Sequence, residues 1–348
     1  MASPAAGLFK LSVLNPAGRD PEQYFETEIK PDSGGHPPIN FHGFAACTGG
    51  AFHRDAKDAL AEKAPILLLL GRNLKHSQRA LLQCKEEKRT VVVSLKETGL
   101  HQIAQQLSDH KKMCRFFEIV TQADGCLATT PEAAEIYRRV RGKQDPATVA
   151  FIPTPYPLED RQWDLSTPPD KQSGIFIGTR EWNVPSRNHF AALLTARQLC
   201  EATGENVTVF NLDGRKGARW LSALKYPEGK LRVIEERKGY ADYVREVGKH
   251  KIVWQLDRSR VPGQVAGDAL LCRTVCVGGD GTIDRIAFPN SCGEGRTFDQ
   301  LSIIALELLK NLTARSTTVM ESQWRGLERL SFEAVRMQLV NFFARLEK

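Results

Sequence analysis

Several features of membrane, disordered and highly charged proteins are missing from this sequence. Its longest aliphatic run, Ile66 to Leu70, is far shorter than the ~20 residues of a membrane-spanning helix. The first residues have neither a basic start nor an extended apolar core, so we expect no signal peptide and no transmembrane segment. The net charge of +7 permits an anionic partner without requiring one. Hydrophobic residues make up 41% and charged residues 26% of 348 residues, which excludes a wholly disordered chain and fits two domains.

Motifs for metal and disulfide chemistry are also missing. None of the eight cysteines forms a Cys-x-x-Cys pair, and no Cys/His cluster has zinc-binding spacing. Asp-x-Asp and Gly-x-Gly-x-x-Gly motifs do not occur either. We therefore predict reduced thiols in a cytoplasmic protein, with no required metal.

What the sequence does contain is an alternation of short apolar runs and amphipathic segments in both halves, typical of parallel βαβ units. The first half is predicted to have strands at 9–14, 39–46, 66–70, 90–95, 125–129 and 149–152. Its helices are predicted at 77–85 and 100–108, with one further helix that ends at Ala61 and another that begins after Thr130. The second half is predicted to have strands at 174–178, 207–212, 231–235, 251–256 and 274–277, and helices at 186–201, 240–248, 264–271, 298–312 and 323–346.

Prolines cluster between the two alternating regions, from Pro153 to Pro169, and indicate a linker. We therefore predict an α/β protein with two Rossmann-like, doubly wound parallel-sheet domains that face a cleft. The predicted boundaries are residues 1–155 for the first domain, 156–173 for the linker and 174–322 for the second domain. Residues 323–348 form a C-terminal helix that we expect to pack back on the first domain.

A basic loop precedes the apolar helix predicted from residue 264. Gly263 allows close approach of the backbone to a phosphate, and the first helix amides and arginine side chains attract anions. Arg180, Arg258 and Arg260 are candidates for neutralising a diphosphate without a metal, although they suit surface salt bridges equally well. Asp268 lies in the apolar helix and needs a polar partner, either a ribose diol or an internal arginine. Arg215 and Lys216 are expected in a solvated basic loop.

Five segments, taken in order and spacing, resemble the GT-B glycosyltransferases, most closely those of family four (glycosyl-transferase-1 type). They are Gly174-Ile-Phe-Ile-Gly-Thr-Arg180, Val207 to Gly214, Tyr240 to Val247, Pro262 to Gly278, and Ala123 to Glu132 with its following helix and the segment Val149 to Pro155. The resemblance covers roughly residues 120–290 and makes the first domain the acceptor domain and the second the nucleotide-sugar domain.

The resemblance implies a hexosyl- or pentosyltransferase that uses a nucleotide-sugar donor, with a UDP-sugar expected. The family places two glutamates eight positions apart around its donor loop, and these positions are occupied here by Arg260 and Asp268. The donor-binding residues that it implies are Gly178, Thr179, Arg180, Arg258, Arg260, Pro262, Gly263, Gln264 and Asp268.

An inverting transferase also needs a general base at a strand end of the first domain. Glu97 directly follows the strand predicted at 90–95. His42 and His53 flank the Gly49-Gly50 turn, and Asp55 lies close behind it. The sequence does not single out one of these candidates.

The acceptor is predicted from charge. Ten basic and five acidic residues lie between Arg54 and Lys96, and Arg72, Lys75 and Arg79 are the expected acceptor-binding side chains. An anionic polymer such as hydroxymethylated DNA fits this excess, as does a polysaccharide or a lipid. A solvated basic helix face is the alternative, because no aromatic series interleaves the charges. A non-catalytic nucleotide-sugar-binding module and a sugar epimerase of the same fold remain alternative functions.

Overall fold

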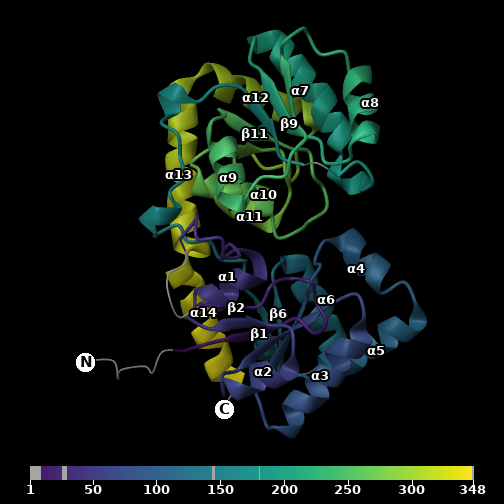
Figure 1. Ribbon diagram of the computed structural model, residues 1–348. Helices are drawn as coiled ribbons and strands as arrows, with labels where there is room; N and C mark the ends of the chain where they lie inside the picture. Colours follow the sequence, from purple (N-terminus) through teal and green to yellow (C-terminus); the bar gives the residue numbers. More distant parts are fainter. Residues whose placement is uncertain (1–8, 26–29, 143–145, 180, 347–348) are drawn as a thin grey trace. The chain divides into compact units, whose positions relative to one another are not determined.

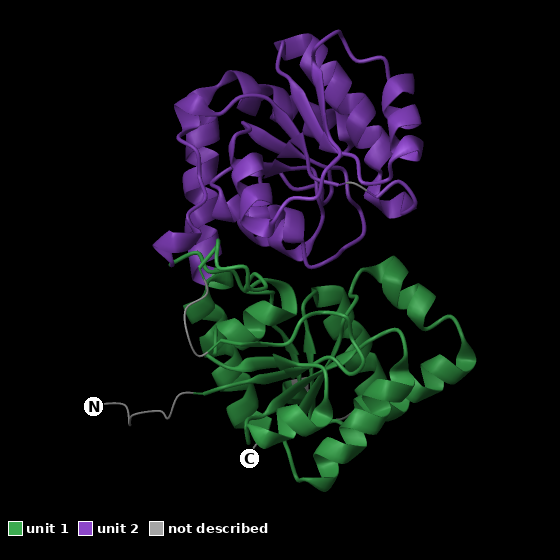
Figure 2. Ribbon diagram, in the orientation of Figure 1, with its two compact units in different colours: residues 1–159, 329–348 green, residues 160–328 purple. Residues whose placement is uncertain are grey.

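The computed structural model describes residues 9–25, 30–142, 146–179 and 181–346, and the chain divides into two compact units (Figure 2). Unit 1 comprises residues 1–159 and 329–348, and unit 2 comprises residues 160–328. The segment predicted as a linker is divided between the two units after Glu159. The C-terminal segment predicted from residue 323 is divided as well, with residues from Arg329 onward in unit 1.

Unit 1 contains a seven-stranded sheet in the order β2-β3-β1-β4-β5-β6-β7 (Figure 1). Its neighbouring strands are parallel, apart from the antiparallel edge pair β2 and β3. The strands are β1 (Ser12–Leu14), β2 (Gln23–Tyr24), β3 (Ala51–His53), β4 (Ile66–Leu70), β5 (Val91–Leu95), β6 (Gly125–Ala128) and β7 (Val149–Phe151).

Helices cover both faces of this sheet because β4 is apolar on both sides. Leu68 belongs to a core formed with α3, α5 and α6, whereas Leu67 and Leu69 belong to a core formed with α1 and α14. Alternating side chains of one strand point to opposite faces, so such a continuous aliphatic run indicates a sheet buried on both sides. The helices of unit 1 are α1 (Asn40–Ala46), α2 (Ala56–Ala61), α3 (Leu74–Glu86), α4 (Leu100–Gln106), α5 (His110–Gln122), α6 (Pro131–Arg141) and α14 (Phe332–Leu346).

Unit 2 contains a five-stranded parallel sheet in the order β10-β9-β8-β11-β12. Its strands are β8 (Ile175–Ile177), β9 (Val207–Phe210), β10 (Leu231–Ile234), β11 (Ile252–Trp254) and β12 (Val275–Val277). Its helices are α7 (His189–Thr203), α8 (Arg215–Ala223), α9 (Tyr240–Gly248), α10 (Gln264–Leu271), α11 (Thr282–Ala287), α12 (Phe298–Lys310) and α13 (Leu312–Leu330). Short 3-10 helices occupy Pro146–Thr148 in unit 1, and Arg161–Trp163, Pro169–Lys171 and Pro185–Arg187 in unit 2.

Helices lie on both faces of the second sheet as well. The indole nitrogen of Trp254 in β11 donates to the Ala192 carbonyl of α7 at 3.0 Å, while Phe176 in β8 packs against Tyr243 of α9 with ring centroids 6.0 Å apart. Phe176 pairs in register with Val253, the residue before Trp254, so these two contacts lie on opposite faces. The predicted α/β class with two Rossmann-like, doubly wound parallel sheets is confirmed.

The segment at 39–46, which the sequence predicts as a strand, is helix α1. All five residues from Phe41 to Ala45 are buried, so the sequence pattern fits a buried helix as well as the buried strand that was predicted. The Pro37-Pro38 pair just before Ile39 is the sequence signal that indicates a break before this helix.

Other element predictions were incomplete. The helix predicted to end at Ala61 is preceded by a strand, β3, and begins only after Asp55. Helices α5 and α11 were not predicted, and the loop expected at Arg215 is helix α8. The single helix predicted at 323–346 is interrupted at Ser331, which forms a bridge with Tyr156. Among the helices that the structure describes, none has the length and apolarity to cross a membrane.

Candidate functional site

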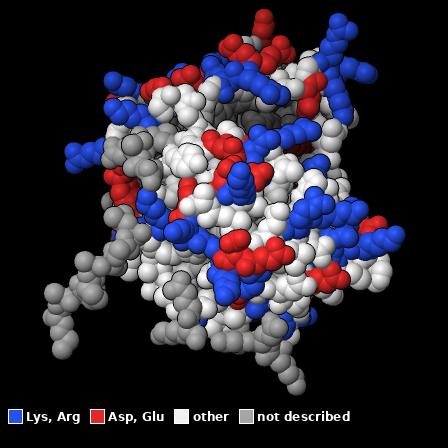
Figure 3. Space-filling model, turned by 60° about the horizontal axis from the view of Figure 1, so that its bottom comes forward, with Lys and Arg blue, Asp and Glu red and all other residues white. Residues whose placement is uncertain are grey.

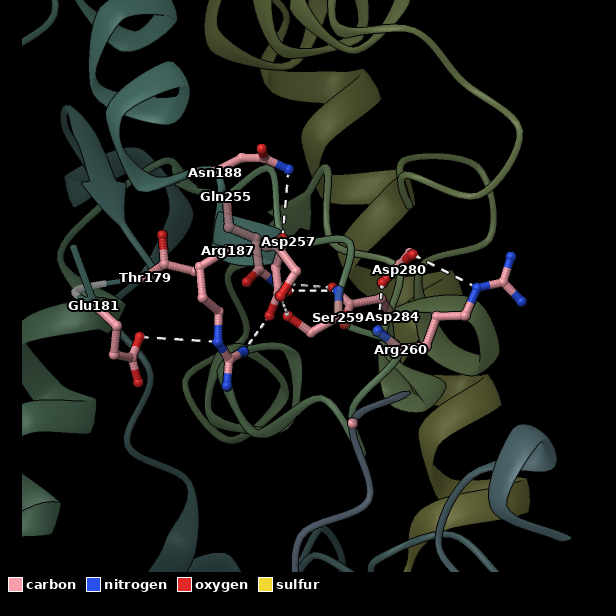
Figure 4. A network of polar contacts seen from close by, with 12 residues as sticks. Thr179, Glu181, Arg187, Asn188, Gln255, Asp257, Ser259, Arg260, Asp280 and Asp284 are labelled. Carbon is pink, nitrogen blue, oxygen red and sulfur yellow. Dashed lines mark hydrogen bonds and ion pairs between the residues drawn. The ribbon is translucent and has the colours of Figure 1, made fainter. Parts of the chain in front are cut away.

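The strand order of unit 2 reverses beside β8. The chain passes from β8 outward through β9 to β10 and then returns to β11 on the other side of β8. In open α/β sheets, ligands bind outside the carboxyl ends of the strands at such a switch point. Here β8 continues into Thr179 and β11 continues into Gln255 and Asp257, all three of which are buried polar residues. Figure 4 shows them gathered in one polar network.

Asp257 anchors the loop that follows β11. Its carboxylate forms an ion pair with Arg187 and also accepts a hydrogen bond from the Ser259 amide at 2.8 Å. Arg187 lies immediately before α7, and its Nε is 4.0 Å from Glu181 Oε2. Figure 4 shows Arg187 extended toward Asp257. The start of α7 and the loop after β11 are therefore held together by a largely buried charge pair.

Two further carboxylates, those of Asp280 and Asp284, contact residues that follow β11. Asp280 accepts a hydrogen bond from the Arg260 amide at 3.0 Å, and its Oδ2 is 3.9 Å from Arg260 Nε. Asp284 accepts from Gln255 Nε2 at 2.9 Å. Burial raises the pKa of Asp280, while burial and then the charge of Asp257 raise the pKa of Asp284 to about 7. The loop after β11 is therefore hydrogen-bonded to Asp280 and lies close to Asp284, whose carboxyl group titrates near neutral pH.

Two glycines allow close packing around the start of α10, Gly178 at the end of β8 and Gly263 against α11. A Cβ atom on Gly178 would lie 2.5 Å from Val265 Cγ1, and one on Gly263 would lie 3.0 Å from Asp284 Oδ2. Gly263 also has φ of +95°, in the left-handed region, and caps α10 without a side-chain hydrogen bond. The first amides of a helix have no intrahelical acceptor, which suits them to a phosphate group.

Asp268 lies one turn into α10 and is 2% exposed. The Tyr240 hydroxyl at the start of α9 donates to its Oδ1 at 2.6 Å. A buried carboxylate needs such a donor, and tyrosine was not among the partners that the sequence suggested. Whether Asp268 also binds a ribose stays a prediction.

The predicted donor-site arginines differ in their surroundings. Arg258 donates to the Gly293 and Arg296 carbonyls, the latter at 2.8 Å, and its guanidinium lies 5.7 Å from the centre of the Phe298 ring. These contacts hold the Arg258 side chain in place, and its role in donor binding stays a prediction. The Arg260 side chain is 42% exposed, and Arg180 lies outside the described residues.

The remaining predicted donor-site residues lie at the start of α10 and directly after β8. The Pro262 carbonyl accepts from the Ile283 amide at 3.0 Å, and Gln264 is exposed as the first residue of α10. Thr179 Oγ1 is 3.3 Å from Nδ1 of His189, the first residue of α7. Burial lowers the pKa of His189 to about 4, so the imidazole is neutral at physiological pH.

The candidate bases of unit 1 each have a local partner. Glu97 accepts from Gln102 Nε2 at 2.7 Å, and Asp55 caps α2 by accepting from the Lys57 amide at 2.8 Å. His42 is stacked between His36 and Phe52, and burial lowers its pKa to about 4. The structure gives these residues helix-capping and packing roles, and a catalytic role for any of them stays a prediction. His53 Nε2 is 3.2 Å from Glu62 Oε1.

The predicted acceptor-binding side chains lie at the start of α3. Arg72, Lys75 and Arg79 are all exposed, and Lys75 and Arg79 are one helical turn apart. Figure 3 brings the lower part of Figure 1 forward and shows basic side chains interspersed with acidic ones. Further along α3, Lys85 is paired with Asp124 at 2.6 Å. The basic excess of the sequence is therefore partly neutralised in the fold.

Several residues of the network were missed by the sequence analysis. Gln255 and Asp257 directly follow β11, and Asp280 follows β12 within Gly278-Gly-Asp-Gly281. Polar residues directly after buried strands are a signal that sequence alone offers, since these ends meet at one edge of a parallel sheet. Within the described ranges, no group of three or more His, Cys, Asp or Glu is arranged to hold a metal ion.

The two sheets, their helical layers and their topology define the GT-B fold class. No protein-family model matches the chain, and no curated protein sequence is similar to it. The Anabaena protein HepE, solved in complex with UDP, matches with a TM-score of 0.62 and 10% identity over 97% of this chain and 100% of that one.

Two further solved structures have the same fold. Sucrose-phosphate synthase from Thermosynechococcus elongatus matches with a TM-score of 0.59 and 12% identity, covering 97% of this chain and 99% of that one. A mutant of TarM from S. aureus, solved with UDP among its ligands, matches with a TM-score of 0.61 and 11% identity over 80% of this chain. The chain spans about half of TarM, covering 55% of its length. The GT-B fold that the sequence resemblance implied is confirmed.

Proposed function

We propose that this protein is a glycosyltransferase that moves a sugar from a nucleotide-sugar donor to a hydroxyl acceptor. The observation that carries the proposal is the switch point of unit 2. Gly178 lets the end of β8 approach the start of α10, and Gly263 lets that start lie against α11, beside the buried Asp268. Two solved proteins of this fold, HepE and TarM, are described with UDP, and this supports a UDP-sugar as the donor.

The donor's parts match distinct groups of the site. We expect its diphosphate to lie at the first amides of α10, near the half-exposed guanidinium of Arg260, and its ribose hydroxyls to bind Asp268. When the acceptor oxygen attacks the anomeric carbon, the bond to the diphosphate breaks and negative charge builds up on the departing oxygen. Positioned amides and a guanidinium stabilise that charge without a metal ion. A carboxylate or imidazole takes the acceptor proton, and Glu97, His42 and Asp55 remain the candidates.

For the acceptor, we propose a hydroxyl group on an anionic polymer such as hydroxymethylated DNA. The excess of basic residues between Arg54 and Lys96, with Arg72, Lys75 and Arg79 exposed, supports this choice. All eight cysteines are free thiols, which supports a reducing compartment such as the cytoplasm.

The decisive assay measures nucleoside-diphosphate release from UDP-, GDP-, ADP- and dTDP-sugars. Each donor is tested alone, with unmodified DNA, with hydroxymethylated DNA, and with polysaccharide or lipid acceptors. Release that depends on one donor and one acceptor is the expected result. A free sugar of inverted configuration at a ring carbon without transfer identifies an epimerase. Thermal stabilisation by a nucleotide sugar with no turnover on any acceptor identifies a binding module. Neither turnover nor stabilisation with any donor overturns the assignment.

The role of Asp268 is tested by Asp268→Asn, with Tyr240→Phe as the matched control. If Asp268 binds the ribose diol, loss of the charge weakens donor binding by about 10-fold or more, since a charged hydrogen bond contributes about 1.5–3 kcal/mol. Tyr240→Phe removes the 2.6 Å hydrogen bond but leaves the carboxylate, so we expect a smaller loss. Calorimetric titration with UDP measures both. Equal affinities for the wild type and Asp268→Asn would remove Asp268 from the donor site.

A further inference from the structure

Three aromatic side chains gather on the outer surface of α7 and α8 in unit 2. The Trp182 ring stacks on Trp220 with centroids 6.0 Å apart and planes 20° apart, and Phe190 meets Trp220 nearly perpendicularly at 5.8 Å. Trp220 and Phe190 are each 46% exposed, and Figure 1 shows α8 beside α7 at the outer side of the unit. Large aromatic side chains are usually buried, so a cluster left exposed indicates a binding surface.

The cluster is held in place by its surroundings. A Cβ atom at Gly217 in α8 would overlap Asn211 Oδ1 and lie 3.2 Å from Trp182 Nε1. A glycine at this position therefore lets the Trp182 ring lie against α8. The other side of Trp182 contacts His189 edge-on, with centroids 4.4 Å apart. The aromatic rings form a fixed platform, which lowers the entropy cost of binding a planar ligand.

Basic side chains surround this platform. Residues 215–232 contain six basic residues and one acidic residue, and Arg215, Lys216 and Arg219 are exposed in the first two turns of α8. The nearby acids include Asp213, just before α8, and Glu181, which lies 4.0 Å from Arg187. Glu235 also lies close by and accepts a hydrogen bond from Asn211 Nδ2 at 3.3 Å. The segment between Arg54 and Lys96 has a similar basic excess but contains no Phe, Tyr or Trp.

We propose that this surface, made of Trp182, Phe190 and Trp220 with Arg215, Lys216 and Arg219, binds single-stranded nucleic acid; we call it the α8 platform. Bases of a single strand stack on exposed aromatic rings, and the adjacent cations contact the phosphates. Such a surface tolerates any sequence because every base has an aromatic face. The inference rests on the α8 platform alone and holds whether or not the donor site transfers a sugar.

An anionic lipid surface would also attract the basic side chains, but the aromatic geometry favours nucleic acid. Insertion into a lipid surface requires apolar side chains that protrude from the protein into the lipid. The Trp220 ring is instead contacted by Trp182 and by Phe190, so it offers a ring surface for stacking and not a protruding side chain. Three cations within the same two helical turns match the closely spaced charges of a nucleic-acid backbone.

The test is fluorescence anisotropy with labelled oligothymidylate of about 16 nucleotides, at KCl concentrations between about 50 and 200 mM. We expect the wild type to bind with an affinity that falls as salt rises. Trp220→Ala should weaken binding by roughly 5- to 150-fold, whereas Trp220→Phe, which keeps a stacking ring, should stay closer to the wild type. Arg215→Gln combined with Lys216→Gln should lower the slope of log affinity against log salt by about 1.4.

The matched control is Lys111→Gln combined with Lys112→Gln, which removes two exposed cations from the first turn of α5 in unit 1, outside the residues proposed to bind the acceptor. This control should bind like the wild type, and circular dichroism should show that every variant is folded. The proposal is overturned if the wild type does not bind the oligonucleotide. It is also overturned if Trp220→Ala binds equally well, or if the α5 control loses binding while the α8 variants keep it. Binding to vesicles rich in phosphatidylserine without binding to the oligonucleotide would assign the α8 platform to a lipid surface instead.

Discussion

At the scale of single residues, the buried carboxyl group of Asp284 makes the stability of the folded protein depend on pH. It is buried at the switch point, and its pKa is raised from an ordinary 3.8 to about 7 by burial and by the charge of Asp257. A raised pKa means that the folded state binds the proton more tightly than the unfolded state does. The stability that the protonated form provides is therefore complete below about pH 4 and is lost as the pH rises through about 7.

We predict that Asp284→Asn removes most of this pH dependence. The amide keeps an acceptor oxygen for Gln255 Nε2 but has no charge to desolvate. The wild type should lose about 3–4 kcal/mol of unfolding free energy between pH 4 and 8 from this group, at roughly 1.4 kcal/mol per pKa unit, and the variant should not. Urea unfolding across this pH range measures the difference, with Asp170→Asn, an exposed aspartate of unit 2, as control. Parallel pH profiles for the wild type and Asp284→Asn would contradict the assignment.

Residues of the candidate site could be predicted from the sequence where the residues that act together lie close to each other along the chain. Gly263 and Asp268 belong to one loop and helix, so their spacing was visible. Arg187 and Asp257 were not paired in advance, because 70 positions separate them and only the parallel packing of β8 beside β11 brings them together. The Tyr240 partner of Asp268 comes from a different helix for the same reason.

At the scale of elements, the start of α10 depends on one glycine. We predict that Gly263→Ala destabilises unit 2 by about 1–3 kcal/mol and weakens donor binding, because its φ of +95° disfavours a side chain and its Cβ would press against Asp284 Oδ2 at 3.0 Å. Gly204→Ala is the control: its φ of +73° is also left-handed, but nothing lies within 4 Å of its Cβ. Thermal unfolding and UDP titration compare the two. The prediction fails if both variants show the same stability and the same affinity for UDP.

Elements were predicted well where one pattern dominated the local sequence. The aliphatic strand β4 and the helix α6, with Thr130 as its cap and Pro131 in its first turn, match the prediction closely. Helix α1 was misassigned because eight mostly apolar residues fit a buried strand as well as a buried helix, and tertiary packing decided between them. Helix α8 was missed because its buried face is small, comprising Gly217 and Leu221.

At the scale of the whole molecule, the chain returns to unit 1 after completing unit 2. Helix α14 contributes Val335, Leu339, Phe342 and Phe343 to the core that also contains α1 and the strands of unit 1. The first unit therefore lacks part of its core until the last residues are present. An apolar stripe near the C-terminus was visible in the sequence, but the helix break at Ser331 was not, because it depends on the bridge to Tyr156.

This arrangement predicts that damage to the C-terminal helix unfolds unit 1 and not unit 2. Phe342→Ala removes a fully buried ring and should lower the unfolding free energy of unit 1 by about 3–5 kcal/mol. Met337→Ala in the same helix, where the side chain is 46% exposed, should cost little. Hydrogen exchange resolved by peptide should show faster exchange in β4, β5 and β6 of the Phe342→Ala variant while β8, β9 and β11 keep their protection. Equal acceleration in both sheets would show instead that the two units unfold together, and acceleration in unit 2 alone would contradict the assignment of α14 to unit 1.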